Sequence, residues 1–186
     1  MLRKAAILLL AVSLSGCAEL PGAPSESHAM PSVAGPPGSA SDLGELIYLG
    51  AQTLAERCGR LTKDRPIIVT TMVSIDDLSK SSTFGRLASE LIANRLTQRG
   101  YQVRDVNYTG ALTIKPETGE LVLSREASKL SATINAQAIV AGTYAVGGQE
   151  IYLNIRLINA DDGTVLSSSD VVLPRDRNIQ AMVVGG

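Results

Sequence analysis

The residue with the clearest chemistry in this sequence is Cys17, whose thiol closes a short apolar segment and follows the small residues Ser15 and Gly16, with Leu14 before them. A cysteine in this setting is typical of sites where the sulfur is joined to a diacylglyceryl group and the preceding peptide bond is cut. Two acyl chains, such as palmitate, hold a protein stably on a membrane, whereas one chain gives only reversible binding. The sequence therefore predicts lipid attachment at Cys17.

The segment before Cys17 has the layout of an export signal. Arg3 and Lys4 form a basic start, and residues 5–12 form an apolar run that is too short to cross a bilayer. Residues 1–16 thus resemble a bacterial lipoprotein signal peptide, the alternative being an ordinary secretory signal with an incidental cysteine. Residue 18 is Ala, not the Asp that marks inner-membrane retention in enteric-type lipoproteins. By analogy, we expect an anchor in the outer membrane, on its periplasmic or cell-surface face.

Two further residue types limit the chemistry of the chain. His28 is the only histidine and lies in a Pro- and Gly-rich stretch, so we expect neither a Ser-His or Cys-His pair nor a histidine metal site on the domain. Once Cys17 carries lipid, Cys58 is the only thiol left, and no intramolecular disulfide can form. Its place on the apolar face of an expected helix predicts a buried, inert side chain.

Two groups of acidic and amide residues are candidate sites, and we interpret both as turns. Asp76 and Asp77 are adjacent on an expected loop, where Asp is common for conformational reasons. Asn159, Asp161 and Gly163 have some of the spacing of a calcium loop, but the bidentate glutamate at its end is missing. We therefore predict no catalytic, cofactor-binding or metal site, and no enzymatic activity.

Composition and charge restrict the partners. The export signal takes two of the 17 basic residues with it, so the mature chain carries 15 basic and 18 acidic residues, a formal charge of −3. Nucleic-acid binders normally carry a basic face, so none is expected here. Five Tyr and one Phe are too few for a base-stacking platform. No other apolar run approaches the ~20 residues of a membrane-spanning helix.

The chain divides by composition into four parts. After the signal at 1–16, residues 17–42 are rich in Pro, Gly and Ser and are expected to form a disordered tether, which as ~25 residues of coil would span ~25–30 Å. Residues 43–174 match one ordinary domain. Residues 175–186 are expected to form a C-terminal tail.

Hydrophobic periodicity predicts three helices and a mixed set of strands in the domain. The helices start near Asp42, Ser82 and Ser124, with Gly100 ending the second. The expected strands are Ile67–Val73, Tyr101–Val106, Leu112–Lys115 with Leu121–Leu123, Ala138–Val146, Ile151–Ile158 and Thr164–Leu173.

The last three strands indicate the fold class. Gly147-Gly148 and Asp161-Asp162-Gly163 are strong turn signals, so these strands form an antiparallel meander. The middle strand alternates apolar residues with Tyr152, Asn154 and Arg156, which predicts one dry face and one solvated face. We therefore expect an α/β (α+β) domain with a mixed sheet and three helices packed on one face.

The order of these elements resembles the FlgO family, lipoproteins of the flagellar outer-membrane apparatus. The resemblance covers about residues 43–173 and is carried by the following segments: Pro66–Leu78, Phe84–Ala88 with Glu90, Arg99–Val103, Gly119–Leu121, Leu123–Glu126 and Ile139–Tyr144. It implies a fold similar to CsgG-type secretion lipoproteins and to the N-terminal domain of TolB, without catalytic residues.

The same resemblance implies a function. It indicates an outer-membrane lipoprotein that faces the periplasm or cell surface and supports flagellar assembly or motility. Its partners would be proteins of the cell envelope, among them the flagellar basal body, and a homo-oligomer remains open. The alternatives are an accessory lipoprotein of a CsgG-like secretion apparatus and an enzyme of the envelope. A pore needs membrane strands of ~9–11 residues, longer than the hairpin at 112–123.

Overall fold

The computed structural model describes residues 40–116 and 121–185, so the expected signal peptide and nearly all of the expected tether lie outside the described residues. The helices within these ranges are α1 (Ala40–Arg57), α2 (Thr83–Gln98), α3 (Arg125–Ile134) and α4 (Arg177–Val184). The strands are β1 (Ile67–Thr70), β2 (Val73–Ser74), β3 (Val103–Val106), β4 (Leu112–Ile114), β5 (Leu121–Leu123), β6 (Ala138–Val146), β7 (Glu150–Asn159) and β8 (Val165–Pro174).

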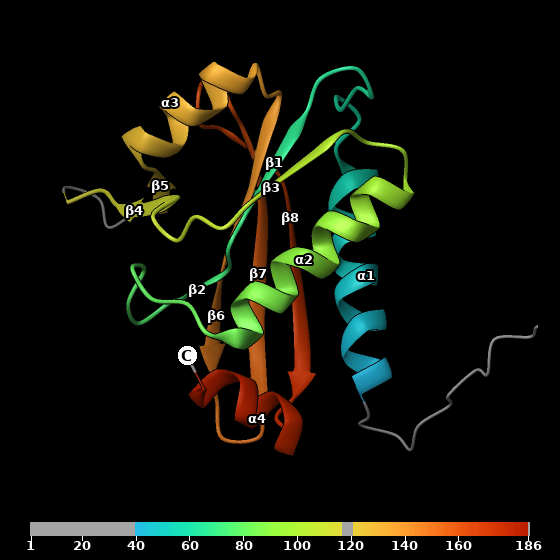
Figure 1. The fold of residues 1–186 in the computed structure, drawn as a ribbon, viewed down its shortest axis with the longest axis vertical. Coiled ribbons are helices and arrows are strands. Elements are labelled where there is room, and N and C mark those ends of the chain that lie inside the picture. Colours follow the sequence, from blue (N-terminus) through green and yellow to red (C-terminus); the bar gives the residue numbers. More distant parts are fainter. Residues whose placement is uncertain (1–39, 117–120, 186) are drawn as a thin grey trace, which may run out of the picture. The chain divides into compact units, whose positions relative to one another are not determined.

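The main sheet is mixed, as expected from the sequence (Figure 1). Its strands lie in the order β3-β1-β6-β7-β8, and β2 pairs with β6 beyond the end of β1. β1 is parallel to both of its neighbours, whereas β6, β7 and β8 form the predicted antiparallel meander. β4 and β5 form a separate two-stranded antiparallel sheet. The fold class is therefore confirmed.

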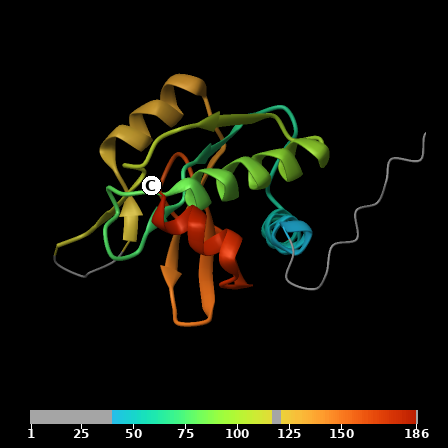
Figure 2. The same ribbon diagram turned by 60° about the horizontal axis from the view of Figure 1, so that its bottom comes forward.

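One face of the main sheet is covered by α1, α2 and α4 (Figures 1 and 2). Buried apolar side chains of these helices pack against the inward residues of the strands. Phe84 of α2 stands edge-on to Tyr144 of β6, with ring centroids 5.3 Å apart. This is the larger of two separate cores; its largest fully buried side chains include Phe84, Ile47, Leu54, Ile67, Met72, Ile92, Leu96, Ile151, Leu153 and Ile155.

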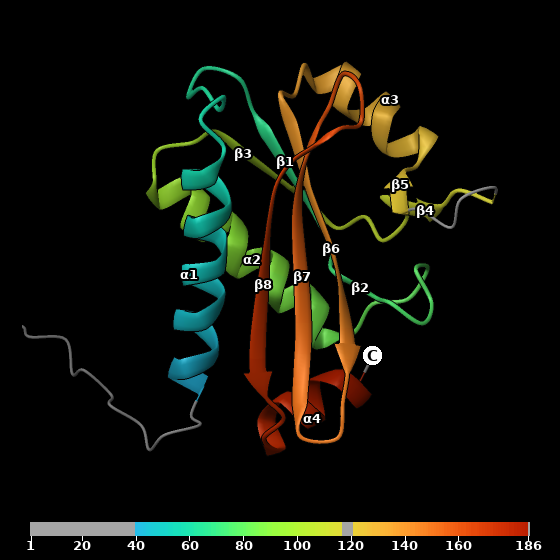
Figure 3. The ribbon, with the colours of Figure 1, turned by 180° about the vertical axis from the view of Figure 1, so that it is seen from behind.

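The opposite face is covered at one end by α3 and the β4–β5 hairpin, which corrects the expectation that all helices pack on one face (Figure 3). The reason is the burial of the central strands. In β1 and β6, Ile68 and Ile139 point away from the main core, and both are fully buried in a second core with Leu112 and Ala127. Apolar side chains on both faces of these strands require a cover on each side.

Residues 175–186 were expected to be a tail, but they contain the helix α4. The side chain of Asp176 caps it by accepting a hydrogen bond from the Ile179 N–H at 2.8 Å. Ile179 is 2 % exposed, and Met182 and Val183 also pack on the main core. The three apolar residues fall at i, i+3 and i+4, which is helical spacing.

Three local predictions are confirmed and one is modified. Ser82 and Ser124 cap α2 and α3 through their side chains, and Gly100 follows α2 with a φ of 84°. The strand predicted at residues 67–73 is split into β1 and β2, because two residues between them leave the ladder. Gly100 is in the left-handed region that favours glycine after a helix.

Candidate interaction site

Of the two cysteines, only Cys58 lies in the part of the chain that the structure describes. Cys17, the predicted lipid site, lies outside the described residues, as does His28. Cys58 is free and only 6 % exposed, which confirms the prediction of a buried thiol. Within residues 40–116 and 121–185, no helix has the length and apolar character needed to cross a bilayer.

Asp76 and Asp77 lie in the loop between β2 and α2. The Asp77 carboxylate accepts hydrogen bonds from the Ser79 hydroxyl at 2.6 Å and the Ser79 N–H at 3.0 Å. Its other oxygen lies 3.1 Å from the Lys80 ammonium. The Ser79 hydroxyl, with Lys80 as a further cause, lowers the pKa of Asp77 to about 2. These contacts support the interpretation of this segment as a solvated turn.

The Asn159–Gly163 segment is the turn between β7 and β8. The Asn159 side-chain oxygen accepts from the Asp161 N–H at 2.9 Å, and Asp162 accepts from Thr164. Gly163 has a φ of 74°, which the tight turn requires. Across the described ranges, no group of three metal-ligating side chains comes together.

The solvated face of the meander is largely open, as the alternation in β7 predicts (Figure 3). Tyr152 is 50 % exposed and stands opposite Val172 of β8, which is 47 % exposed. Two residues further along β7, on the same face, the Asn154 side-chain amide donates to Asp170 at 2.5 Å and accepts from Arg156 Nε at 3.0 Å. This face therefore has an apolar end beside a hydrogen-bonded polar network.

β8 is an edge strand, and its alternate residues direct their backbone groups outward. The Arg175 N–H donates to Gln149 O at 2.8 Å, which makes these two residues a hydrogen-bonded pair of the antiparallel ladder. Such pairs alternate with pairs that exchange no hydrogen bonds. The N–H and C=O groups of Ser168, Asp170 and Val172 therefore point to the open edge. They are ready to pair with another extended chain.

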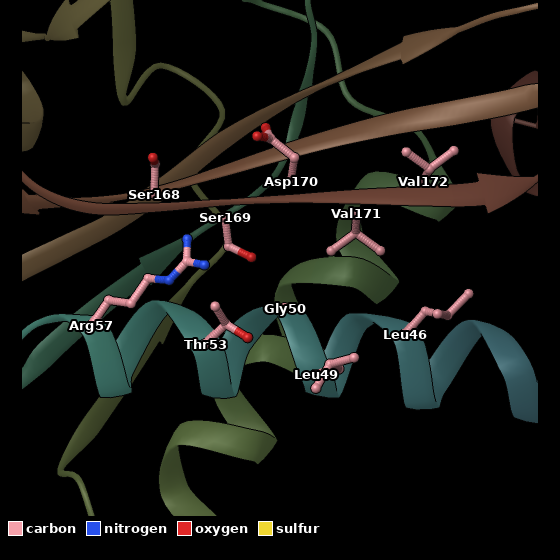
Figure 4. A pocket seen from close by; sticks show the side chains of 10 residues that line it. All are labelled: Leu46, Leu49, Gly50, Thr53, Arg57, Ser168, Ser169, Asp170, Val171 and Val172. Atoms are coloured by element: carbon pink, nitrogen blue, oxygen red, sulfur yellow. The ribbon is translucent and has the colours of Figure 1, made fainter.

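α1 runs along this edge at close range. A Cβ placed on Gly50 would lie 2.4 Å from Cγ2 of Val171, so the glycine lets the helix approach the strand. Between α1 and β8 is an open groove of about 390 Å³, which we call the edge groove (Figure 4). Its lining consists of Leu46, Leu49, Gly50, Thr53 and Arg57 of α1 and residues 168–172 of β8.

The two ends of the edge groove differ in chemistry (Figure 4). One end is formed by Leu46 and Leu49 of α1 together with Val172 of β8, and Leu49 is 61 % exposed. At the other end the Arg57 guanidinium lies beside Ser168 and Ser169. Among the described residues, nothing forms an ion pair or hydrogen bond with Arg57. The groove therefore combines an apolar end, a cationic end and unpaired backbone groups along one side.

Sequence reasoning missed the edge groove, although it identified the open face that adjoins it. In α1 the apolar residues at helical spacing, Leu46 among them, predict only the buried side. Leu49, Thr53 and Arg57 have helical spacing too, and Leu49 is an apolar residue in a position that the core does not use. Which strand forms an edge depends on the strand order, and that order cannot be read from local patterns.

Comparison with protein families identifies the chain. A family model described as FlgO protein matches residues 49–178. The chain belongs to the FlgO family. This confirms the resemblance inferred from the sequence, with a matched range about five residues further toward the C-terminus. A comparison with curated proteins gave no match.

Several solved structures are similar to the chain at low sequence identity. The LpoB C-terminal domain from Salmonella enterica is 16% identical, covers 68% of this chain and 97% of that chain, and has a TM-score of 0.46. A PelC dodecamer from Paraburkholderia phytofirmans is 18% identical, with coverages of 67% and 84% and a TM-score of 0.43. Lipoprotein GNA1162 from Neisseria meningitidis is 17% identical, with coverages of 63% and 90% and a TM-score of 0.40.

Proposed function

We propose that this FlgO-family protein is a lipid-anchored outer-membrane protein that supports flagellar assembly or motility by docking onto an envelope protein. Family membership over residues 49–178 is the observation that carries the proposal. The proposal includes no catalytic step. The Asp77 carboxylate accepts hydrogen bonds within its own loop, and the Asn159 side chain accepts one within the β7–β8 turn.

The anchor in this proposal is the lipid on Cys17. The motif at residues 14–17 supports it, as does the basic and apolar segment before it. With two or more acyl chains the attachment would be stable, and the tether would let the domain find a partner near the membrane.

The docking surface in this proposal is the end of the sheet formed by β8. The open face with Tyr152 lies on one side of this strand and the edge groove with Leu49 lies on the other, and Val172 borders both. Exposed apolar residues flanked by polar ones are typical of protein-binding surfaces. Both sides therefore support a role as an interaction module.

Gene deletion with complementation tests the proposal. The deletion strain should lose most of its swimming on soft agar, and electron microscopy should show fewer or defective flagella. Wild-type protein should restore both, whereas Cys17→Ser should restore neither, because the domain would no longer be held at the membrane. A deletion strain that swims and carries flagella like its parent would contradict the flagellar role.

Cys58→Ser is the matched control for the anchor. It also removes a thiol, but one that is buried in the main core. It should keep incorporation of an alkyne-labelled palmitate and restore swimming, whereas Cys17→Ser should incorporate none. Labelling that persists in Cys17→Ser would overturn the assignment of the lipid site.

A further inference from the structure

We propose that the edge groove binds an extended segment of the partner protein, which adds to the main sheet as a strand beside β8 and carries an acidic side chain opposite Arg57. This inference rests on the proposed docking role and specifies how the docking is made. The partner is thus defined by its chemistry: an unpaired strand with apolar residues at one end and an anionic residue at the other.

The backbone of β8 carries the first part of the inference. Ser168, Asp170 and Val172 direct N–H and C=O groups to the open edge, so the edge offers three donors in alternate positions. Pro174 ends the strand and has no N–H to offer. An extended chain is the ligand that satisfies such a row of alternating donors and acceptors.

The side chains define the sequence of that extended chain. Successive residues of an added strand point alternately to the two faces of the sheet. On the α1 side they would meet Leu46 and Leu49 at one end and Arg57 at the other. On the open side they would continue the apolar row of Tyr152 and Val172. Arg57 lacks an anionic partner among the described residues, so an Asp or Glu of the incoming strand would supply one.

A second copy of this chain fits the groove less well. Two β8 strands that pair antiparallel around a two-fold axis run in opposite directions. The cationic end of one groove, at Arg57, would then lie against the apolar end of the other, at Leu46 and Leu49. Such pairing would also bring the Asp170 carboxylates of the two copies near each other. Charge complementarity therefore favours a foreign strand with matching polarity.

The proposal can be tested with synthetic peptides on the purified full-length lipoprotein in detergent. The probes are ten-residue peptides of alternating Val and Thr in which a single Glu occupies successive positions. Fluorescence anisotropy should detect binding of at least one register. Replacing its Glu by Lys should weaken binding at least tenfold, and Arg57→Glu should reverse that preference. N-methylation of alternate peptide amides should abolish binding, because it removes donors to β8.

Proline substitution tests the same contact from the protein side. Ser168→Pro removes an outward N–H without touching the ladder to β7, and proline is tolerated on edge strands at such positions. It should weaken peptide binding at least tenfold, whereas Ser168→Ala, which changes the side chain but keeps the N–H, should weaken it far less. In the complex, hydrogen exchange should slow at the amides of Ser168, Asp170 and Val172. The N-methylated peptides keep the test valid if the proline variant fails to fold.

Three results would overturn the inference: no peptide binds, binding is unchanged by both N-methylation and Ser168→Pro, or sedimentation shows a stable dimer that Ser168→Pro dissociates. The third would assign the groove to a second copy. None of these measurements uses swimming as a readout. A normally swimming deletion strain would therefore reject the flagellar role and leave this inference standing. Failure of the peptides to bind would reject strand addition and leave the flagellar role standing.

Discussion

The two edges of the main sheet are built differently. β8 has ten residues, and between Val165 and Pro174 its only charged side chain is Asp170, which is bound to Asn154. β3 has four residues, and its middle two, Arg104 and Asp105, are charged and exposed. Short length and charge are the usual means by which an edge strand avoids pairing with other chains.

The difference shows which edge is suited to binding. β3 is a protected edge, whereas β8 offers a long row of outward backbone groups with the edge groove beside it. A sheet with two open edges would be prone to aggregation, so protection of one edge limits association to the other. The following predictions use this contrast, from the largest expected effect to the smallest.

The orientation of the β8 backbone can be tested by proline at adjacent positions. Ser169→Pro removes an N–H that pairs with β7 at a buried position, so it should lower the free energy of unfolding by about 2–4 kcal/mol. Ser168→Pro, whose lost N–H faces the edge, should cost less than about 1 kcal/mol. Urea denaturation followed by circular dichroism measures both. Equal losses would refute the assignment of outward and inward residues.

The role of the edge groove in motility can be tested with an exposed apolar residue. Leu49→Asp places a carboxylate at the apolar end of the groove and should reduce swimming of the complemented deletion strain to the level of the deletion. Ile114→Asp on β4 is the matched control, since that residue is similarly exposed at 53 % but lies outside the groove. It should swim normally. Normal swimming of both variants would contradict docking at the groove.

The close approach of α1 to β8 can be tested with two glycines of the same helix. Gly50→Ala would force Val171 and the helix apart and should destabilise the domain by about 1 kcal/mol. Gly44 has no heavy atom within 4 Å of an added Cβ, so Gly44→Ala should stabilise it by about 0.5–1 kcal/mol. Unfolding midpoints of both variants measure the effect. A gain at Gly50 would mean that the helix is not held at this distance by Val171.

The charged edge should carry a small stability cost that depends on pH. Partial desolvation of its carboxyl group raises the pKa of Asp105, although the residue as a whole is exposed, and the negative charge of Glu90 adds to the rise. A raised pKa in the folded state means that the ionised form opposes folding above that pKa and that the cost disappears below the unfolded pKa. Asp105→Asn should therefore raise the melting temperature at pH 7, by on the order of 1 °C, and leave it unchanged near pH 3.

A matched variant separates the two causes. Glu90→Gln should give part of the same increase at pH 7, and adding Asp105→Asn to it should give a smaller further gain than Asp105→Asn alone. A decrease in melting temperature with Asp105→Asn at pH 7 would show that the carboxylate stabilises β3 instead.

Much of the fold was predictable because its signals are local. Ser82, Ser124 and Gly100 mark helix ends by their own chemistry, and the alternation in β7 identifies its dry and solvated faces. The position of α3 depends on the strand order, because only that order shows Ile68 and Ile139 side by side beneath it. The helix α4 was missed although Asp176 and Ile179 carried its signal.

The two candidate sites also differ in whether their signal is local in the sequence. The lipid-attachment motif at Cys17 is a continuous stretch of sequence and was readable directly, and it remains a prediction because it lies outside the described residues. The edge groove brings Leu49 and Arg57 of α1 beside β8, whose residues come more than 100 positions later in the chain. A single sequence contains no signal for that proximity, because it arises only when α1 packs on the last strand of the sheet.

Complementation with variants at Ser168 tests the central claim most directly. The deletion strain would receive wild-type protein, Ser168→Ala or Ser168→Pro, with immunoblots of outer-membrane fractions to establish equal amounts. The account predicts that wild type and Ser168→Ala restore swimming and that Ser168→Pro does not, since it lacks one outward N–H at the edge of β8. Full swimming with Ser168→Pro at wild-type abundance would contradict docking by strand addition at this edge.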